Sequence, residues 1–240
     1  MKDVKVKPYR KKFEYSYAMG MFPTIELLRN KPTKIIKILL SDNANKTKEL
    51  ERIIHLCRQN KIPFYFADKL IGKIAKKENT YAVGVFEKYE ETLEPRENHL
   101  MLINPSDMGN LGTIIRTMIG FGYQNLAVIK PGADIFDPRV VRSSMGALFN
   151  LKFEYFDSFE DYTERFEFHN LYPFLIDGKK ELSKVNFKKA STLIFGNEGR
   201  GLDPKFKEIG QSVFIKQNKD IDSLNLAVSV GVVLHEVFSK

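Results

Sequence analysis

The segment Asn104-Pro-Ser-Asp-Met-Gly-Asn-Leu-Gly-Thr-Ile-Ile-Arg-Thr-Met-Ile-Gly-Phe-Gly122 places an arginine inside an otherwise apolar helical run that opens from a glycine-bearing loop. Within it, Ile114 pairs with Met118 and Ile115 with Ile119 one helical turn apart. These pairs form two apolar stripes that face a core. The segment therefore predicts a helix that is packed on one side and carries a charged group elsewhere.

That charged group, Arg116, lies on the helical stripe between Gly112 and Gly120, so its guanidinium stays open to an approaching partner. A permanently charged fork held against an apolar element requires an anionic or carbonyl partner. A half-exposed arginine whose charge reaches solvent gives the same pattern. From this segment alone, both a binding site and a solvated surface arginine stay open as interpretations.

The charge of the chain is unevenly distributed. Its 240 residues suffice for one large or two modest domains. Residues 1–98 hold 21 Lys and Arg against 13 Asp and Glu, whereas residues 99–240 hold 17 of each kind. A basic excess confined to one region favours a nucleic-acid partner over a merely lysine-rich soluble surface.

Membrane and metal partners are not expected. No apolar run reaches the roughly 18 residues of a membrane span, and no hydrophobic signal core follows the basic N-terminus. We therefore expect a cytoplasmic protein. Cys57 is the only cysteine, which leaves no disulfide or thiolate zinc cluster. The four histidines, His55, His99, His169 and His235, lack ligand spacing and are interpreted as structural or surface residues.

The hydrophobic pattern divides the chain in two. Residues 1–90 alternate helices and strands, which predicts a small basic α/β sandwich with an N-terminal tail. Residues 91–98 are polar and proline-bearing and predict a linker. Residues 99–240 predict an α/β domain on a mainly parallel sheet. Its expected strands are 99–103, 126–130, 171–176, 192–195 and 213–215, and its expected helices are 113–121, 138–149, 204–209 and 223–238.

Two further segments of the second domain place polar residues after apolar runs. Three glycines in Gly196-Asn-Glu-Gly-Arg-Gly-Leu202 allow a sharp turn around Glu198, although a plain loop has the same composition. The helix expected at 223–238 is apolar nearly all round, which predicts that it is buried with Asn225 one turn inside it. Asp222 or Ser223 would cap that helix.

These polar residues follow three expected strands, and in open α/β folds ligands bind where the carboxyl ends of the strands meet. Neither Gly-x-Gly-x-x-Gly nor Gly-Lys-Ser/Thr follows the first strand. The sequence therefore predicts a ligand other than a dinucleotide or a nucleoside triphosphate.

Taken in order, several segments resemble the motifs of the SpoU (TrmH-like) branch of the SPOUT RNA methyltransferases. The matching segments are Asn104–Gly122, Asp137-Pro-Arg-Val-Val-Arg-Ser-Ser-Met-Gly-Ala147, Phe195–Leu202 and Ser223-Leu-Asn225 with its helix. The resemblance covers residues 99–240, and residues 14–90 more loosely resemble the ribosomal-protein-L30e-like substrate-binding domain. It implies a deep trefoil knot, a homodimer formed through the C-terminal domain, S-adenosylmethionine as methyl donor, and the 2′-hydroxyl of a ribose in rRNA or tRNA as acceptor.

The resemblance also implies site residues. Asn110 and Arg116 match the first motif, Glu198 the second, and Ser223 and Asn225 the third, all as catalytic residues. The implied cofactor-binding residues are Phe195, Gly196, Asn197, Ile215 and Leu224. Family proposals make the arginine a base, but a guanidinium with a pKa above about 12 suits a phosphate clamp or an alkoxide stabiliser at least as well. Glu198 could also help the proton leave.

The chain departs from the family pattern beside the cofactor loop. Where the family usually has Pro-Met and then a glycine, this sequence has Lys216-Gln217 and Lys219, and Gly231 replaces a usual alanine. The departure at Lys216 to Lys219 supports an alternative, a catalytically weak relative that binds RNA as an assembly factor. A simple ribosomal-protein-like RNA-binding module would explain the first domain but leave Asn110, Arg116, Glu198 and Asn225 without a purpose.

Overall fold

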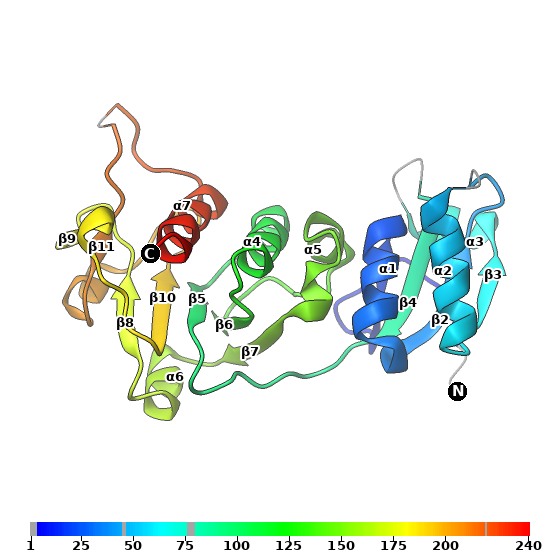
Figure 1. Ribbon diagram of the computed structural model, residues 1–240, viewed down its shortest axis with the longest axis horizontal. Coiled ribbons are helices and arrows are strands. Elements are labelled where there is room, and N and C mark those ends of the chain that lie inside the picture. Colours follow the sequence, from blue (N-terminus) through cyan, green and yellow to red (C-terminus); the bar gives the residue numbers. More distant parts are fainter. Residues whose placement is uncertain (1–3, 45–46, 76–79, 219) are drawn as a thin grey trace. The chain divides into compact units, whose positions relative to one another are not determined.

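The computed structural model describes residues 4–44, 47–75, 80–218 and 220–240. The chain forms two compact units (Figure 1): Met1–Tyr89 with Asp134–Asn150, and Glu90–Ala133 with Leu151–Lys240. We refer to them as unit 1 and unit 2. The polypeptide therefore leaves unit 1, returns to it and leaves it again. The division between functional domains at residues 91–98 stays a prediction.

Unit 1 contains a four-stranded sheet in the order β1-β4-β2-β3. The strands are β1 (Tyr15–Met19), β2 (Ile35–Leu40), β3 (Phe64–Phe66) and β4 (Ala82–Glu87). Three helices follow the strands, namely α1 (Met21–Asn30), α2 (Lys48–Gln59) and α3 (Asp68–Ile74), and a 3-10 turn η1 (Pro32–Lys34) links α1 to β2. Gly84 in the central strand is what lets α1 approach, because a Cβ there would lie 2.5 Å from Leu27 Cδ2.

Residues 134–150 pack on the first unit although they come from the middle of the second domain's sequence. They form α5 (Pro138–Ser143) and a 3-10 turn η2 (Ala147–Asn150). The Phe149 ring lies 5.2 Å from the Phe86 ring of β4, and the Phe136 ring lies 5.9 Å from it. Gly146 has φ +84 and would bring a Cβ to 2.9 Å from Pro23 Cα, so a larger residue does not fit.

Unit 2 contains a five-stranded parallel sheet in the order β7-β6-β5-β10-β8. The strands are β5 (His99–Ile103), β6 (Asn125–Ile129), β7 (Lys152–Phe156), β8 (Asn170–Pro173) and β10 (Ser191–Phe195). Strands β6 and β7 follow β5 in the chain and lie on one side of it. Strands β8 and β10 come later in the chain and lie on the other side, with β10 next to β5. The strand order therefore reverses between β5 and β10, which is where open parallel sheets bind ligands.

Helices cover both faces of this sheet. Figure 1 shows α4 (Met108–Gly120) and α7 (Leu226–Phe238) side by side on one face and α6 (Phe159–Arg165) on the other. A 3-10 turn η3 (Leu182–Lys184) lies after β9 (Lys180–Glu181), and β9 pairs with β11 (Val213–Phe214). In the described part of the chain, no helix is long and apolar enough to cross a membrane.

The predicted α/β class and parallel sheet are confirmed, but several predicted elements are wrong in extent. The helix expected at 138–149 ends at Ser143, because Met145 and Gly146 both take positive φ and turn the chain. The element expected as a helix at 204–209 is a 3-10 turn, η4 (Pro204–Glu208). The strand expected at 213–215 is β11, which belongs to a separate two-stranded sheet. The trefoil knot stays an expectation.

Four of the observed strands and α-helices were absent from the prediction: β1, β7, β9 and α6. Edge strand β7 alternates the polar residues Lys152 and Glu154, which form ion pairs at the surface, with apolar residues, and this short period-two pattern was overlooked. The short helix α6 does carry a signal, since Ser158 and Asp161 form a reciprocal capping box.

Candidate active site

The loops after β5 and β10 meet at the reversal point of the sheet and are joined by one carboxylate. Glu198 accepts hydrogen bonds from the Ser106 backbone N–H at 3.1 Å and its hydroxyl at 2.9 Å, and from the Asp107 N–H at 3.0 Å. Asp107 in turn caps α4 by accepting from Asn110 N. Glu198 therefore fixes the beginning of the helix that carries Asn110 and Arg116.

These contacts also set the ionisation of Glu198. Its partial burial would by itself raise the pKa, but the hydrogen bonds from Asp107 and Ser106 outweigh this and lower the pKa below its usual value. A carboxylate that already accepts several hydrogen bonds is held in its charged form. This arrangement suits an anionic clamp between the two loops better than a base that takes up a proton.

The β10 loop closes on itself through the residues next to Glu198. Asn197 and Gly201 exchange two backbone hydrogen bonds, and the Asn197 amide also donates to the Asn104 carbonyl at 2.8 Å. At Gly196 a Cβ would lie 2.0 Å from the Gly201 carbonyl carbon. Glycine is therefore the residue that this closed turn permits at position 196.

Asn225 joins the third segment to the first, but not as the sequence predicted. The expectation of a buried amide one turn inside a helix that starts at Ser223 is wrong. Asn225 is exposed and is itself the N-cap of α7, with its side-chain oxygen accepting from Ala227 N at 2.9 Å. Its amide nitrogen donates to Asn110 Oδ1 at 3.1 Å. One side chain thus starts α7 and ties it to α4.

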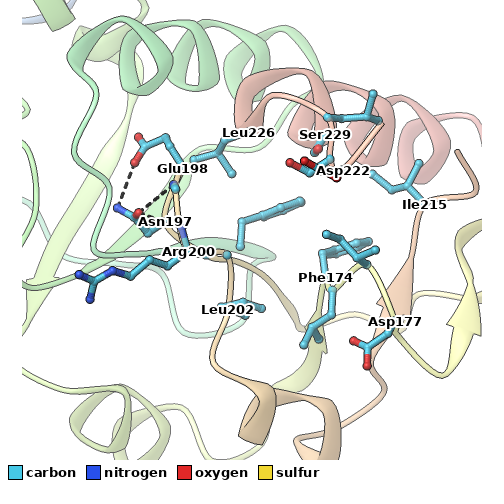
Figure 2. A pocket seen from close by; sticks show the side chains of 18 of the residues that line it. Phe174, Asp177, Asn197, Glu198, Arg200, Leu202, Ile215, Asp222, Leu226 and Ser229 are labelled. Atoms are coloured by element: carbon cyan, nitrogen blue, oxygen red, sulfur yellow. Dashed lines mark hydrogen bonds between the residues drawn. The ribbon is translucent and has the colours of Figure 1, made fainter. Parts of the chain in front are cut away.

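A cavity of about 440 Å³ opens beside these loops (Figure 2). This volume falls within the range of about 300–1,000 Å³ typical of small-molecule sites. Figure 2 shows Asn197 and Glu198 on one side of it and Asp222 and Ser229 on the other. Its apolar wall includes the stacked rings of Phe174 and Phe195, whose centroids lie 4.6 Å apart.

The cavity brings together seven of the ten residues that the sequence singled out. All of those expected to bind cofactor line it, together with two of the expected catalytic residues: Phe195, Gly196, Asn197, Ile215 and Leu224, and Glu198 and Ser223. Asn110 and Asn225 lie outside the lining but are connected to each other. Sequence reasoning did not single out Phe174, which stacks on Phe195 from a distant strand end and carries no local signal.

Arg116 lies on α4 outside the cavity lining. Its side chain is exposed, and within the described residues it has no hydrogen-bond or ion-pair partner. The arginine therefore does not link parts of the core of unit 2, and its five N–H donors remain available to an external acceptor.

The departures from the family pattern differ in their relation to the cavity. Gln217 lines it, and its amide donates to the Asp222 carbonyl at 3.4 Å. Lys216 is exposed and outside the lining, and Lys219 lies outside the described residues. Gly231 has room to spare, because a Cβ there would come no closer than 3.8 Å to Thr117. Gln217 is therefore the described departure that can alter the cavity.

Two protein-family models match the chain. Residues 97–235 match the SpoU rRNA Methylase family, and residues 17–79 match the RNA 2'-O ribose methyltransferase substrate-binding family. Because the first match covers more than half of the chain, the protein belongs to the SpoU rRNA methylase family. The resemblance seen in the ordered motifs is confirmed.

Individual proteins agree with this assignment. The chain is 28% identical to an uncharacterized tRNA/rRNA methyltransferase of Borreliella burgdorferi, over 88% of this chain and 90% of the relative. It is 33% identical over 140 residues to one of Synechocystis, a match that spans 57% of this chain and about half (51%) of that relative.

Solved structures show the same fold. The AdoMet-bound rRNA methyltransferase of Sinorhizobium meliloti superposes with a TM-score of 0.78 at 25% identity, covering 93% of this chain and 87% of that one. The SpoU methyltransferase AviRb of Streptomyces viridochromogenes superposes with a TM-score of 0.80 at 22% identity, covering 94% of this chain and 89% of that one.

Proposed function

We propose that the protein transfers a methyl group from S-adenosylmethionine to the 2′-hydroxyl of a ribose in RNA. The observation that carries the proposal is the cavity at the reversal point of the parallel sheet, which is lined by every residue expected to bind the cofactor. Support also comes from family membership and from the AdoMet bound by the Sinorhizobium relative.

The residues of the cavity fit such a cofactor. Phe174 and Phe195 offer an apolar face to a planar base, and the glycine turn at Gly196 and Gly201 presents backbone close to a ligand. Asp222 and Ser229 add polar groups on the opposite side. When bound, S-adenosylmethionine supplies an electrophilic methyl group next to a positively charged sulfur.

The remaining task for the protein is to align a weakly nucleophilic hydroxyl and to stabilise the charge that develops on it. Arg116 is a cation on α4 that has no partner among the described residues, and we assign it the clamping of a substrate phosphate or of the developing alkoxide. Asn110 and Asn225 orient the ribose through their shared hydrogen bond. Glu198 acts through position, because it holds the start of α4.

We also propose a homodimer formed through unit 2. The outer face of α7 leaves apolar side chains in solvent, with Val228 52%, Val232 39% and Phe238 68% exposed. Because α4 packs beside α7 and Arg116 lies outside the cavity of its own chain, a second copy seated on this face would also approach the arginine.

Among RNA substrates we favour rRNA, because several relatives are named as 23S rRNA methyltransferases, including one of Bacillus subtilis that is 23% identical over 89% of this chain. The test is mass spectrometry of digested rRNA and tRNA from cells with and without the gene. Loss of one 2′-O-methylated nucleotide from rRNA supports the proposal, and loss from tRNA alone moves the substrate to tRNA.

The competing function, a catalytically weak RNA-binding assembly factor, rests on Gln217 and Lys216 beside the cofactor loop. Calorimetry with S-adenosylhomocysteine separates the two functions. Binding accompanied by a rise in Tm is expected for the methyltransferase. An absence of binding at millimolar ligand would favour the assembly factor.

A further inference from the structure

The ten residues Val4–Phe13, which we call the basic arm, precede both family matches. The arm contains five cations, Lys5, Lys7, Arg10, Lys11 and Lys12, and no acidic residue. The substrate-binding match begins only at residue 17, so the family assignment does not account for the arm. It is nevertheless packed against unit 1, and its packing separates its apolar side chains from its charged ones.

Apolar side chains attach the arm to the sheet. Val4, Val6 and Tyr9 are partly buried and pack against the core cluster that contains Tyr17 and Met19. The intervening lysines, together with Arg10, Lys11 and Lys12, are exposed. The alternation therefore turns one side of the arm toward the core and leaves all its charges on the other.

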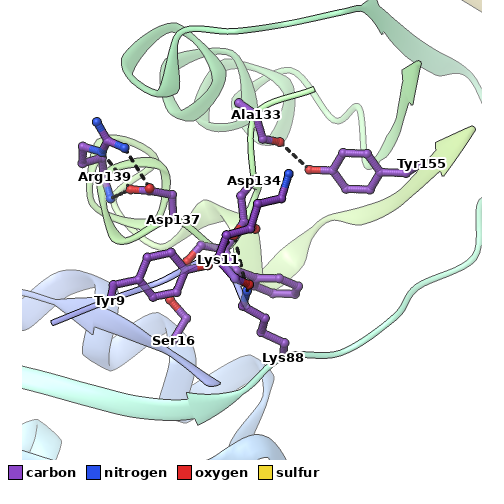
Figure 3. Close-up of polar contacts among 10 residues, drawn as sticks. Tyr9, Lys11, Ser16, Lys88, Ala133, Asp134, Asp137, Arg139 and Tyr155 are labelled. Atoms are coloured by element: carbon purple, nitrogen blue, oxygen red, sulfur yellow. Dashed lines mark hydrogen bonds and ion pairs between the residues drawn. The ribbon is translucent and has the colours of Figure 1, made fainter. Parts of the chain in front are cut away.

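Hydrogen bonds fix the backbone of the arm. The Tyr15 hydroxyl donates to the Lys5 carbonyl at 3.0 Å, and the Tyr17 hydroxyl donates to the Lys7 carbonyl at 2.6 Å while accepting from Lys7 N at 3.1 Å. Lys88 Nζ donates to the Lys11 carbonyl at 2.7 Å (Figure 3). The phenols thus hold the arm by its peptide groups and leave its ammonium groups unused.

The nearby acid is already engaged. Figure 3 shows Asp134 between Tyr9 and Lys88: it accepts from the Tyr9 hydroxyl and forms an ion pair with Lys88 at 3.3 Å. In the described part of the chain, none of the five cations of the arm has an acidic partner. Glu14, the first acid after the arm, is exposed and is a single charge against five.

We propose that the basic arm is a preformed binding site for the phosphate backbone of RNA. Closely spaced, unpaired cations on a fixed backbone match a polyanion, and fixing them beforehand lowers the entropy lost on binding. A membrane surface is a poorer match, because interfacial segments insert apolar side chains and those of the arm are committed to the core. The choice of RNA rests on the proposed function.

The test compares two variants that each remove five positive charges from unit 1. The arm variant is K5Q/K7Q/R10Q/K11Q/K12Q. The control variant replaces four lysines and one arginine that are also exposed in unit 1: K48Q/R58Q/K61Q/K69Q/K73Q. Binding of a fluorescein-labelled 30-nucleotide RNA hairpin is followed by anisotropy between 50 and 300 mM potassium chloride, with the full-length protein.

Each phosphate contact adds about 0.7 to 0.9 to the slope of log affinity against log salt concentration. We expect the arm variant to reduce this slope by about 3 to 4 and the control variant by less than about 1. Equal slopes for the two variants would overturn the proposal, since any basic surface would then serve. If the arm variant does not fold, R10Q/K11Q/K12Q, which spares the lysines held by tyrosines, should still reduce the slope by about 2.

A further pair of measurements tests fixation and separates this proposal from the methyltransferase. Tyr15→Phe/Tyr17→Phe keeps every charge and should weaken RNA binding at an unchanged salt slope; unchanged affinity would show that fixation is irrelevant. S-adenosylhomocysteine binding should be the same in the arm variant as in the wild type. A wild type that fails to bind S-adenosylhomocysteine but binds RNA through the arm would contradict the proposed function and leave the arm standing.

Discussion

The exposed guanidinium of Arg116 has no partner within the described residues, so its removal should leave the fold intact. We expect Arg116→Ala to bind S-adenosylhomocysteine normally and to lose about 10²- to 10³-fold in methyl transfer at saturating RNA, the usual effect of deleting one stabiliser of developing charge. Arg116→Lys keeps the charge but not the planar fork, so strong rescue would indicate a point charge. A loss below tenfold in Arg116→Ala would remove the arginine from the catalytic residues.

Glu198 should act as a fixed anion, and its effect should depend on pH. We expect Glu198→Gln to lower the free energy of unfolding at pH 7 by about 1.5 to 3 kcal/mol, because the hydrogen bonds from Ser106 and Asp107 lose their charged acceptor. The pKa of Glu198 is lowered in the folded protein, so this stabilisation is present above the ordinary pKa of 4.5 and is lost as pH falls through the folded value.

Urea unfolding of wild type and variant at pH 7, 5, 4 and 3 measures this difference. A constant difference across the series would contradict the ionic clamp. If Glu198→Gln loses activity at unchanged stability, the carboxylate takes part in proton transfer instead.

At the scale of the element, the turn after β10 depends on one missing side chain. We expect Gly196→Ala to abolish S-adenosylhomocysteine binding in calorimetry, because the new methyl group would lie 2.0 Å from the Gly201 backbone. Gly199→Ala in the same turn is the matched control, since its nearest contact would be Asn197 Oδ1 at 3.6 Å. Equal binding by the two variants would show that the turn adapts.

The segment 91–98, predicted from its polarity to be a linker, is held against unit 2. Leu93 is buried in the core of that unit. His99 Nε2 donates to the Glu94 carbonyl at 2.9 Å, and His169 Nε2 donates to the Pro95 carbonyl at 2.8 Å. Of the two interpretations, structural or surface residues, burial within this network favours the structural one for both histidines.

The histidines should make the stability of unit 2 sensitive to acid. Burial lowers the pKa of His99 from 6.5 to about 4, and His169 and Arg165 add like charge nearby, while Arg165 is itself paired with Glu154. Burial also lowers the pKa of His169. Below pH 6.5 these histidines bind protons in the unfolded chain but not in the folded protein. The folded state is therefore most stable above pH 6.5 and loses stability as pH falls toward 4.

For His99 alone this amounts to about 3 kcal/mol over that range. Denaturant unfolding should show the decline in the wild type and in the control His55→Gln, whose side chain is exposed. His99→Gln should be less stable at pH 7 but should decline less steeply. A slope identical to that of the wild type would assign the acid sensitivity to other groups.

The elements that could be predicted are those whose signal is local. Periodicity and glycine turns located β5, α4 and β10, and strand alternation indicated the edge at which their loops meet. The position of Asn225 was predicted wrongly because the expected helix start lies about one turn before the observed one. The apolar pattern of the helix does not mark where the helix begins, so it does not distinguish a cap from an interior residue. Phe174, Ser106 and the attachment of residues 134–150 to unit 1 depend on contacts between distant segments, which periodicity does not record.

For the whole molecule, the exposed apolar face of α7 predicts association. We expect Val228→Glu to convert a dimer into a monomer in light scattering. The Val228 side chain is 52% exposed in the single chain, and in the proposed dimer a charge at this position would be buried in the interface. Phe168→Glu, at a side chain that is 55% exposed elsewhere in unit 2, is the control and should leave the dimer unchanged. A monomeric wild type, or a Val228→Glu dimer, would contradict the proposed interface.

The passage of the chain out of unit 1, back into it and out again affects how the protein responds to proteases. A single cut at residues 91–98 would leave residues 134–150 still packed with Phe86 and still joined at both ends to unit 2. Native electrophoresis would then show one particle where a denaturing gel shows two fragments. Cleavage at three places, near residues 90, 133 and 151, is needed before the units can diffuse apart.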